Sequence, residues 1–193
     1  MPNKFLIIPL GYSWVRGHRG VIFSDAQGKI RIKAAIDFGI NQELRSRDVL
    51  YGVMPGVIPP ARGGDGCLSL GEAMVRTFAE YGILTERIVR GNSNVWGSYM
   101  EVDEGLRIAE EMHRAVVFVT STYHVPRLML VCREILGYHA FRRKFNWGTL
   151  DVRGCGNERV STRDLLTEPV KYVAQALRIP FGRFMPKTLH GRL

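Results

Sequence analysis

Residues 116–136, VVFVTSTYHVPRLMLVCREIL, change in character from a buried strand to a helix within a few positions. The Val and Phe residues at the start are typical of a strand that is buried on both faces. Polar side chains follow from Thr120 to His124, and an apolar pattern with a period near 3.6 resumes after Pro126. Ligands of parallel α/β sheets bind at the edge where such strands end. The stretch therefore indicates a fold class and a place for a site.

The rest of the chain alternates between strand and helix patterns in the same way. Further strands are predicted at residues 5–12, 48–54, 86–91 and 138–147, and further helices at residues 29–40, 69–82, 98–113 and 162–178. Strands that are separated by helices form a parallel sheet through right-handed crossovers. We therefore predict an α/β fold, a Rossmann-like three-layer sandwich with a mostly parallel sheet of about five strands. Residues 1–193 are interpreted as one domain.

Several helix ends carry recognisable signals. Gly39 is predicted to end the first helix. Ser69 and Glu72 have the spacing of a capping box at the start of the second, and Gly82 is predicted to end it. The last helix is predicted to bend or begin at Pro169.

Composition narrows the class of protein. The chain has 193 residues, of which 46% are hydrophobic, enough for one substantial core. It contains no apolar run near the roughly 20 residues that span a bilayer, and no membrane insertion is expected. Its N-terminal apolar segment is interpreted as a strand rather than a signal peptide. Cys67, Cys132 and Cys155 are odd in number and form no CxxC pair, so no disulfide framework or metal site is expected and a cytoplasmic location is predicted.

Positive charge is concentrated near the C-terminus. The formal net charge is +9, and residues 142–193 hold eleven Lys or Arg against four Asp or Glu. Such a segment suits nucleic acid, an anionic membrane surface, an acidic partner or an anionic substrate. A solvated basic face is the alternative. No nucleic-acid-binding motif accompanies the charge, and nothing in the sequence indicates the oligomeric state.

The polar residues after the strand at 116–119 form the main candidate site. Ser121 or Thr122 is placed to cap the next helix, whose first N–H groups would face a ligand. Arg127 offers a planar cation that suits carboxylate or phosphate. His124 is a candidate acid or base, since a histidine ordinarily titrates near neutrality. The alternative is that His124 only begins the helix and Arg127 is a surface charge.

Other segments contribute weaker candidates. Gly11 follows the first strand and permits close approach of a ligand. Ser93 and Asn94 lie in a polar turn after the third strand, and residues 61–66, ARGGDG, form a glycine-rich loop without a phosphate-binding signature. Glu72 is interpreted as a cap rather than a catalyst. The acidic residues of the helix at 98–113 are interpreted as a solvated face: Glu101, Asp103 and Glu104.

Four segments together resemble the YdcF-like family, which includes the SanA and ElyC envelope proteins. They are Leu10-Gly11, SLGEAMVRTFAEYGI at 69–83, RGNSNV at 90–95 and VTSTYHVPRLMLV at 119–131. The family's Thr-Ser-x-x-His-x-x-Arg signature is matched by Thr120, Ser121, His124 and Arg127. Its Ser-to-Glu-Ala helix start is matched by Ser69, Glu72 and Ala73.

The resemblance implies a Rossmann-like fold and, from one branch of the family, S-adenosylmethionine as a cofactor. The chain departs from the family where Val95 replaces a threonine and no acid follows at Trp96 to Ser98. It also has VMPG at 53–56 in place of Ser-Gly-Gly, and a membrane anchor like that of the envelope members is not expected.

These observations lead to one principal hypothesis and two alternatives. The principal one is a cytoplasmic protein that binds a small anionic or nucleoside-containing ligand, with S-adenosylmethionine as first candidate. A transfer or hydrolysis reaction is the activity that such a site would support. His124 would contact the ligand, Arg127 would hold its anionic group, and the pocket would be lined by Gly11, Ser69, Glu72, Ser93, Asn94, Thr120 and Ser121. The first alternative is a non-catalytic protein whose basic segment binds an anionic polymer or partner. The second is an enzyme that acts on a phosphorylated or sugar-linked envelope precursor. Because the sequence shows no set of nucleophile, base and orienting group, whether the protein is an enzyme stays open.

Overall fold

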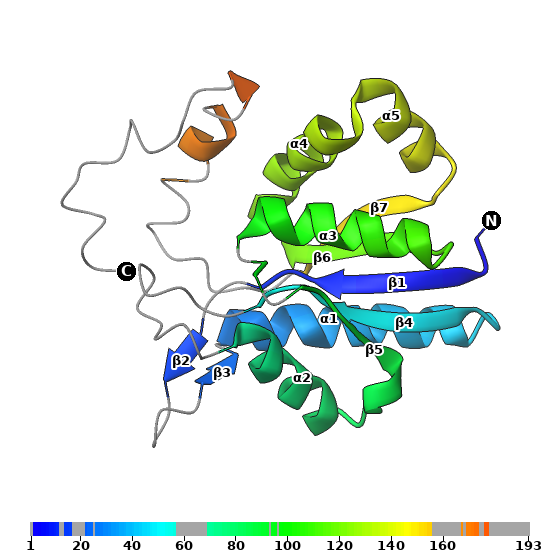
Figure 1. The fold of residues 1–193 in the computed structure, drawn as a ribbon, viewed down its shortest axis with the longest axis vertical. Coiled ribbons are helices and arrows are strands. Elements are labelled where there is room, and N and C mark those ends of the chain that lie inside the picture. The colour runs from blue at the N-terminus through cyan, green and yellow to red at the C-terminus, as the bar shows by residue number, and fades with distance from the viewer. Residues whose placement is uncertain are drawn as a thin grey trace.

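The computed structural model shows a layered α/β fold (Figure 1). It describes residues 2–11, 14–16, 22–24, 26–56, 69–92, 94–95, 97–155, 167, 169–173 and 176–177. The strands are β1 (Lys4–Pro9), β2 (Trp14–Arg16), β3 (Ile22–Ser24), β4 (Asp48–Val53), β5 (Ile88–Arg90), β6 (Ala115–Ser121) and β7 (Leu150–Cys155). The helices are α1 (Ala26–Glu43), α2 (Leu70–Glu80), α3 (Ser98–Glu111), α4 (Val125–Leu136) and α5 (Tyr138–Asn146), with short 3₁₀ helices η3 (Thr85–Arg87) and η4 (Thr122–His124).

Five strands form one parallel sheet in the order β5-β4-β1-β6-β7. The chain leaves β1 toward β4 and β5 on one side, and then returns through α3 to β6 and β7 on the other. The direction of winding therefore reverses between β1 and β6. In open α/β sheets, this reversal is where ligands bind, at the carboxyl ends of the two strands. The predicted α/β sandwich with a parallel sheet of about five strands is confirmed.

Both faces of the sheet are buried, as the apolar strand sequences predict. Helices α1 and α2 cover one face, and α3, α4 and α5 lie on the other (Figure 1). Alternate residues of β1 point to opposite layers: Phe5 and Ile7 join the core beneath α1 and α2, while Leu6 and Ile8 join the core beneath α3 and α4. The central strand is thus fixed from both sides.

Helix α1 does not end at Gly39 as predicted but continues to Glu43. Gly39 faces the sheet, and a Cβ atom there would lie 2.2 Å from the hydroxyl oxygen of Tyr51 on β4. The glycine therefore allows a bulky aromatic residue to fit beneath the helix rather than ending it.

Helix α2 begins and ends close to the predicted positions. The Ser69 hydroxyl oxygen accepts a hydrogen bond from the Glu72 backbone N–H at 3.2 Å, and Gly82 has a positive φ of 79°. The Glu72 carboxylate, however, pairs with Arg90 on β5. The serine cap is confirmed, but the glutamate is held by this ion pair with the neighbouring strand.

The strand predicted at residues 138–147 is wrong, because these residues form α5. Phe141 packs toward the core and stacks on Phe145 one helical turn later, with ring centroids 5.8 Å apart. The fifth strand is instead β7, which pairs with β6 from Leu150 to Cys155. Apolar residues two apart at both ends of this segment fit a strand, whereas the spacing of four between Phe141 and Phe145 also fits a helix.

Two further differences concern the loop regions. The structure contains an antiparallel pair, β2 and β3, which was not predicted. Of the last predicted helix, residues 167, 169–173 and 176 are helical, and the rest of that prediction lies outside the described residues.

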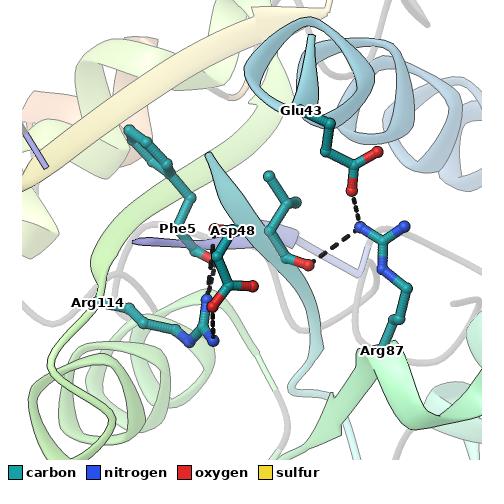
Figure 2. Close-up of polar contacts among 6 residues, drawn as sticks. Phe5, Glu43, Asp48, Arg87 and Arg114 are labelled. Carbon is teal, nitrogen blue, oxygen red and sulfur yellow. Dashed lines mark hydrogen bonds and ion pairs between the residues drawn. The ribbon is translucent and has the colours of Figure 1, made fainter. Parts of the chain in front are cut away.

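Two arginines fasten the amino edge of the sheet (Figure 2). Arg114 donates to the Asp48 carboxylate at 2.6 Å and to the Phe5 carbonyl at 3.3 Å, which joins β6 to β4 and β1. Arg87 pairs with Glu43 and donates to a β4 carbonyl at 3.0 Å. Within the described ranges, none of the helices has the length and apolar character needed to cross a bilayer.

Candidate functional site

The carboxyl end of β1 packs closely against β6, α2 and α3. The Leu10 N–H donates to the Val119 carbonyl of β6 at 2.9 Å, which carries the strand pairing to the edge. At Gly11, a Cβ atom would lie 3.0 Å from a Leu70 methyl carbon and 3.3 Å from a Glu101 carboxylate oxygen. A side chain would crowd both, so glycine suits this position.

Arg31 is a buried cation that joins the ends of β1 and β6. It projects from the second turn of α1 and is only 1% exposed. One guanidinium nitrogen, Nη1, donates to the carbonyls of Leu10 and Gly11 at 3.2 and 3.3 Å. The Nε donates to the Ser121 hydroxyl at 3.1 Å, and Nη2 contacts the same oxygen. Arg31 thus holds the two strand ends together where the winding reverses.

Sequence reasoning missed Arg31. The residue stands beside the apolar stripe of α1, next to Ile32, and an arginine in such a position ordinarily extends to solvent. Its only sequence signal is a cation within an otherwise inward-facing helix turn. Recognising it requires knowing that three carbonyl or hydroxyl acceptors converge there.

Glu101 is a buried carboxyl group on the other side of Gly11. It lies in the first turn of α3, is 3% exposed, and accepts a hydrogen bond from the Gly11 N–H at 2.9 Å. Burial raises its pKa to about 7, although the Gly11 hydrogen bond and the charge of Arg31 act in the opposite direction. The prediction that Glu101 belongs to a solvated face is wrong, because this side of α3 packs on the sheet.

Glu101 and Arg31 therefore bind the same backbone segment from two sides. Glu101 binds the N–H of Gly11, and Arg31 binds the carbonyls of Leu10 and Gly11. Each group restrains a different side of the peptide chain. The end of β1 is held by a hydrogen bond to the Glu101 carboxyl group and by charged hydrogen bonds from Arg31, which are stronger than neutral ones.

His124 lies in a chain of hydrogen bonds with Thr120 and Arg127. The Nε of Arg127 donates to His124 Nε2 at 2.9 Å, and its Nη2 approaches the same atom. Because Nε2 accepts, the imidazole proton resides on Nδ1, which donates to the Thr120 hydroxyl at 3.1 Å. Both ring nitrogens are therefore engaged within the protein.

The expectation that His124 titrates near neutrality is wrong. Burial, followed by the positive charges of Arg127, Arg31 and Lys171, lowers its pKa to about 2. A histidine in an unfolded chain is protonated below about pH 6.5, whereas His124 in the folded protein stays neutral. The contribution of His124 to the free energy of unfolding is therefore greatest above this pH and is lost as the pH falls. In the folded protein, His124 is a neutral group that positions the guanidinium of Arg127.

The other predicted site residues lie in different settings. Ser121 and Thr120 are buried at the end of β6, where their hydroxyls bind Arg31 and His124. The Ser69 hydroxyl caps α2 and donates to the Gly56 carbonyl at 3.3 Å, close to Gly11 through Leu70. Asn94 is exposed and its N–H donates to Asn92 at 2.9 Å within the turn. Ser93 and residues 61–66 lie outside the described residues.

A surface cavity of about 370 Å³ lies elsewhere, between α1 and the neighbouring strands β6 and β7. It is lined by Ala34, Asp37, Phe38, Asn41, Val119, Arg153 and Gly154. The guanidinium of Arg153 covers the ring of Phe38 at 4.2 Å, which occupies the apolar wall with an internal contact. None of the predicted site residues lines this cavity.

The described residues contain no cluster of three or more His, Cys, Asp or Glu that would hold a metal ion. Cys132 and Cys155 are buried, and burial raises the pKa of the Cys132 thiol to about 12. Cys67 lies outside the described residues.

Comparisons of the chain with models of protein families, with curated proteins and with solved structures gave no match. The resemblance to the YdcF-like family therefore stays a prediction, and the candidate site is defined by its geometry.

Proposed function

We propose that the protein binds a small ligand with a carboxylate or phosphate group at the carboxyl ends of β1 and β6. One observation carries the proposal: Arg31, Glu101 and the His124–Arg127 pair converge on the point where the sheet reverses its winding. Burying charged groups is costly, so a fold retains them where they position a backbone or a ligand. The rest of the sheet edge carries no comparable group of buried charges among the described residues.

Positive charge at this edge supports an anionic ligand. Arg127 and Lys171 are both partly buried, and both act electrostatically on His124 from different elements. Neutral His124 adds no positive charge of its own, so the attraction comes from these fixed cations. Arg127 offers the planar donor set that fits carboxylate and phosphate.

S-adenosylmethionine is the first ligand to test. Its carboxylate suits Arg127, and the predicted family resemblance points to the same molecule. Its adenosine would lie along the strand ends, as nucleosides do in doubly wound folds. If the site catalyses a transfer or hydrolysis, Glu101 has a pKa suited to moving a proton near neutrality, whereas His124 does not.

The test compares ligand binding to two arginine variants by calorimetry and thermal shift. Probes are S-adenosylmethionine, S-adenosylhomocysteine and inorganic phosphate. Arg127→Met should weaken binding of the best probe by at least about tenfold, since a charged hydrogen bond contributes roughly 1.5–3 kcal/mol. Arg133→Met, which changes an exposed arginine further along α4, is the matched control and should leave affinity unchanged.

Equal affinity in wild type and Arg127→Met would contradict the assignment of the anion-binding group. If no anionic or nucleoside-containing compound stabilises the protein, the proposed function itself is wrong.

A further inference from the structure

Helix α5 presents a surface of cations and aromatic rings. Its inward side is formed by Ala140, Phe141 and Lys144, which are half-buried against the rest of the fold. Its outward side carries Tyr138, Arg142, Arg143 and Phe145, and Trp147 follows at its end. We call these five residues the α5 surface. Nothing in the proposed ligand site uses it.

Each arginine of the α5 surface contacts an aromatic residue. Arg142 donates to the Tyr138 hydroxyl at 3.4 Å, and the Arg143 guanidinium lies 5.8 Å from the Trp147 ring centroid. Neither arginine has a carboxylate partner among the described residues, and α5 itself contains no acidic residue. Arg87 and Arg114 at the amino edge contrast with this, because each has an acidic partner (Figure 2).

The aromatic rings of the α5 surface are exposed. Tyr138 is 53% exposed, Phe145 39% and Trp147 68%. Leaving three such rings in water on and just after one short helix forgoes hydrophobic stabilisation. Exposed apolar groups that cluster on a surface indicate a site that binds another molecule or a membrane.

We propose that the α5 surface binds the headgroup region of a membrane that contains anionic phospholipid. Arginines pair with lipid phosphates, while Trp, Tyr and Phe side chains enter the interface between headgroups and acyl chains. The absence of acidic residues from α5 gives the charge complementarity that an anionic surface requires. Protein partners of arginine-rich surfaces supply carboxylates in fixed positions, whereas a lipid surface accepts a simple mixture of cations and rings.

Nucleic acid is the competing class of partner, and the geometry favours it less. Proteins that stack bases hold the strand in a positively charged groove lined by aromatic side chains. The rings here lie on the outside of a helix, and none of them lines the cavity of about 370 Å³ between α1 and β7. A convex helix with rings and cations on its outer side suits a surface.

The α5 surface lies far from the candidate ligand site along the strand direction. Helix α5 leads directly into the amino end of β7, whereas the ligand site lies at the carboxyl ends of β1 and β6 (Figure 1). Membrane contact through α5 therefore leaves the ligand-binding edge uncovered. The two proposals are independent and can fail separately.

The test measures co-sedimentation of the full chain with vesicles. One set contains phosphatidylcholine and phosphatidylglycerol in equal parts, and the other contains phosphatidylcholine alone. Wild type should sediment with the anionic vesicles, its tryptophan emission should shift to the blue in a way that Trp147→Ala abolishes, and added salt should release it. Charge reversal in the double variant R142E/R143E should weaken binding at least about tenfold, and Trp147→Ala should weaken it at constant charge.

The matched control is the double variant K33E/R76E, which changes the net charge equally on the opposite side of the sheet. It should bind the anionic vesicles as wild type does. Failure of wild type to bind them, or equal losses in both double variants, would overturn the proposal. Binding of single-stranded RNA that depends on Arg142 and Arg143, without vesicle binding, would assign the surface to nucleic acid instead.

Discussion

Glu101 is almost completely buried, and burial removes the water that stabilises an ionised carboxylate. The N–H of Gly11 and the charge of Arg31 offset part of that cost, and its pKa still rises to about 7. The folded protein therefore binds a proton at Glu101 between about pH 4.5 and 7 that the unfolded chain does not. Stability from this group is present at low pH and is lost as the pH rises through about 7.

Replacing the carboxyl by an amide tests this account. In Glu101→Gln, the amide oxygen still accepts from Gly11 but does not titrate. Relative to the variant, the wild-type protein should lose up to about 3 kcal/mol of unfolding free energy between pH 5 and pH 8. Urea unfolding at the two pH values measures the difference. A wild-type-to-variant difference that is the same at both pH values would show that Glu101 does not titrate in this range.

Sequence reasoning located part of the site and not the rest, for a reason visible at single residues. The polar stretch at the end of β6 was found because strand ends in parallel sheets bind ligands. Arg31 and Glu101 were missed because charged residues on amphipathic helices are ordinarily solvated. Their burial depends on which backbone groups of β1 lie opposite them, and a sequence does not show that pairing. The same enclosure makes His124 neutral, contrary to expectation.

At the scale of elements, packing overrides the local signals of helix ends. Glycine is common at helix ends, but α1 continues past Gly39. The glycine is placed there because Tyr51 of β4 fills the space that its side chain would need. The Tyr51 hydroxyl is buried without a hydrogen-bond partner, and burial raises its pKa to about 12. The close packing of α1 on β4 thus depends on Gly39. It also leaves the Tyr51 hydroxyl buried without a hydrogen bond.

Gly39→Ala should destabilise the protein by about 1–3 kcal/mol, despite the better helix propensity of alanine, because the new methyl group clashes with Tyr51. Tyr51→Phe alone should be neutral or stabilising, since it removes an unsatisfied buried hydroxyl. In the double variant, the loss should be smaller than in Gly39→Ala. Chemical unfolding of the four proteins measures the coupling. Additive effects would mean that the two residues do not compete for this space.

The strand and helix patterns predicted most of the sheet and misplaced one element. β1, β4, β5 and β6 lie within or close to the predicted ranges, because each has a compact run of apolar residues. The error at residues 138–147 arose because α5 is short and keeps its rings partly exposed. These exposed rings obscure the helix periodicity, and they are also the reason for proposing a second binding surface at α5.

For the whole molecule, the fold separates two kinds of surface. The carboxyl edge of the sheet holds buried charges arranged around β1 and β6, while α5 presents exposed cations and rings near the amino end of β7. The net charge of +9 therefore does not describe one uniform basic face. Each surface has its own test, and neither depends on the other.

The central claim is that a ligand binds where the winding of the sheet reverses. Hydrogen–deuterium exchange, followed by mass spectrometry with and without the probe that stabilises the protein most, tests this claim directly. Peptides that contain Leu10–Gly11 and residues 120–128 should gain protection on binding, while those that cover α5 should not change. Protection confined to the cavity between α1 and β7, or no protection at either strand end, would contradict the claim.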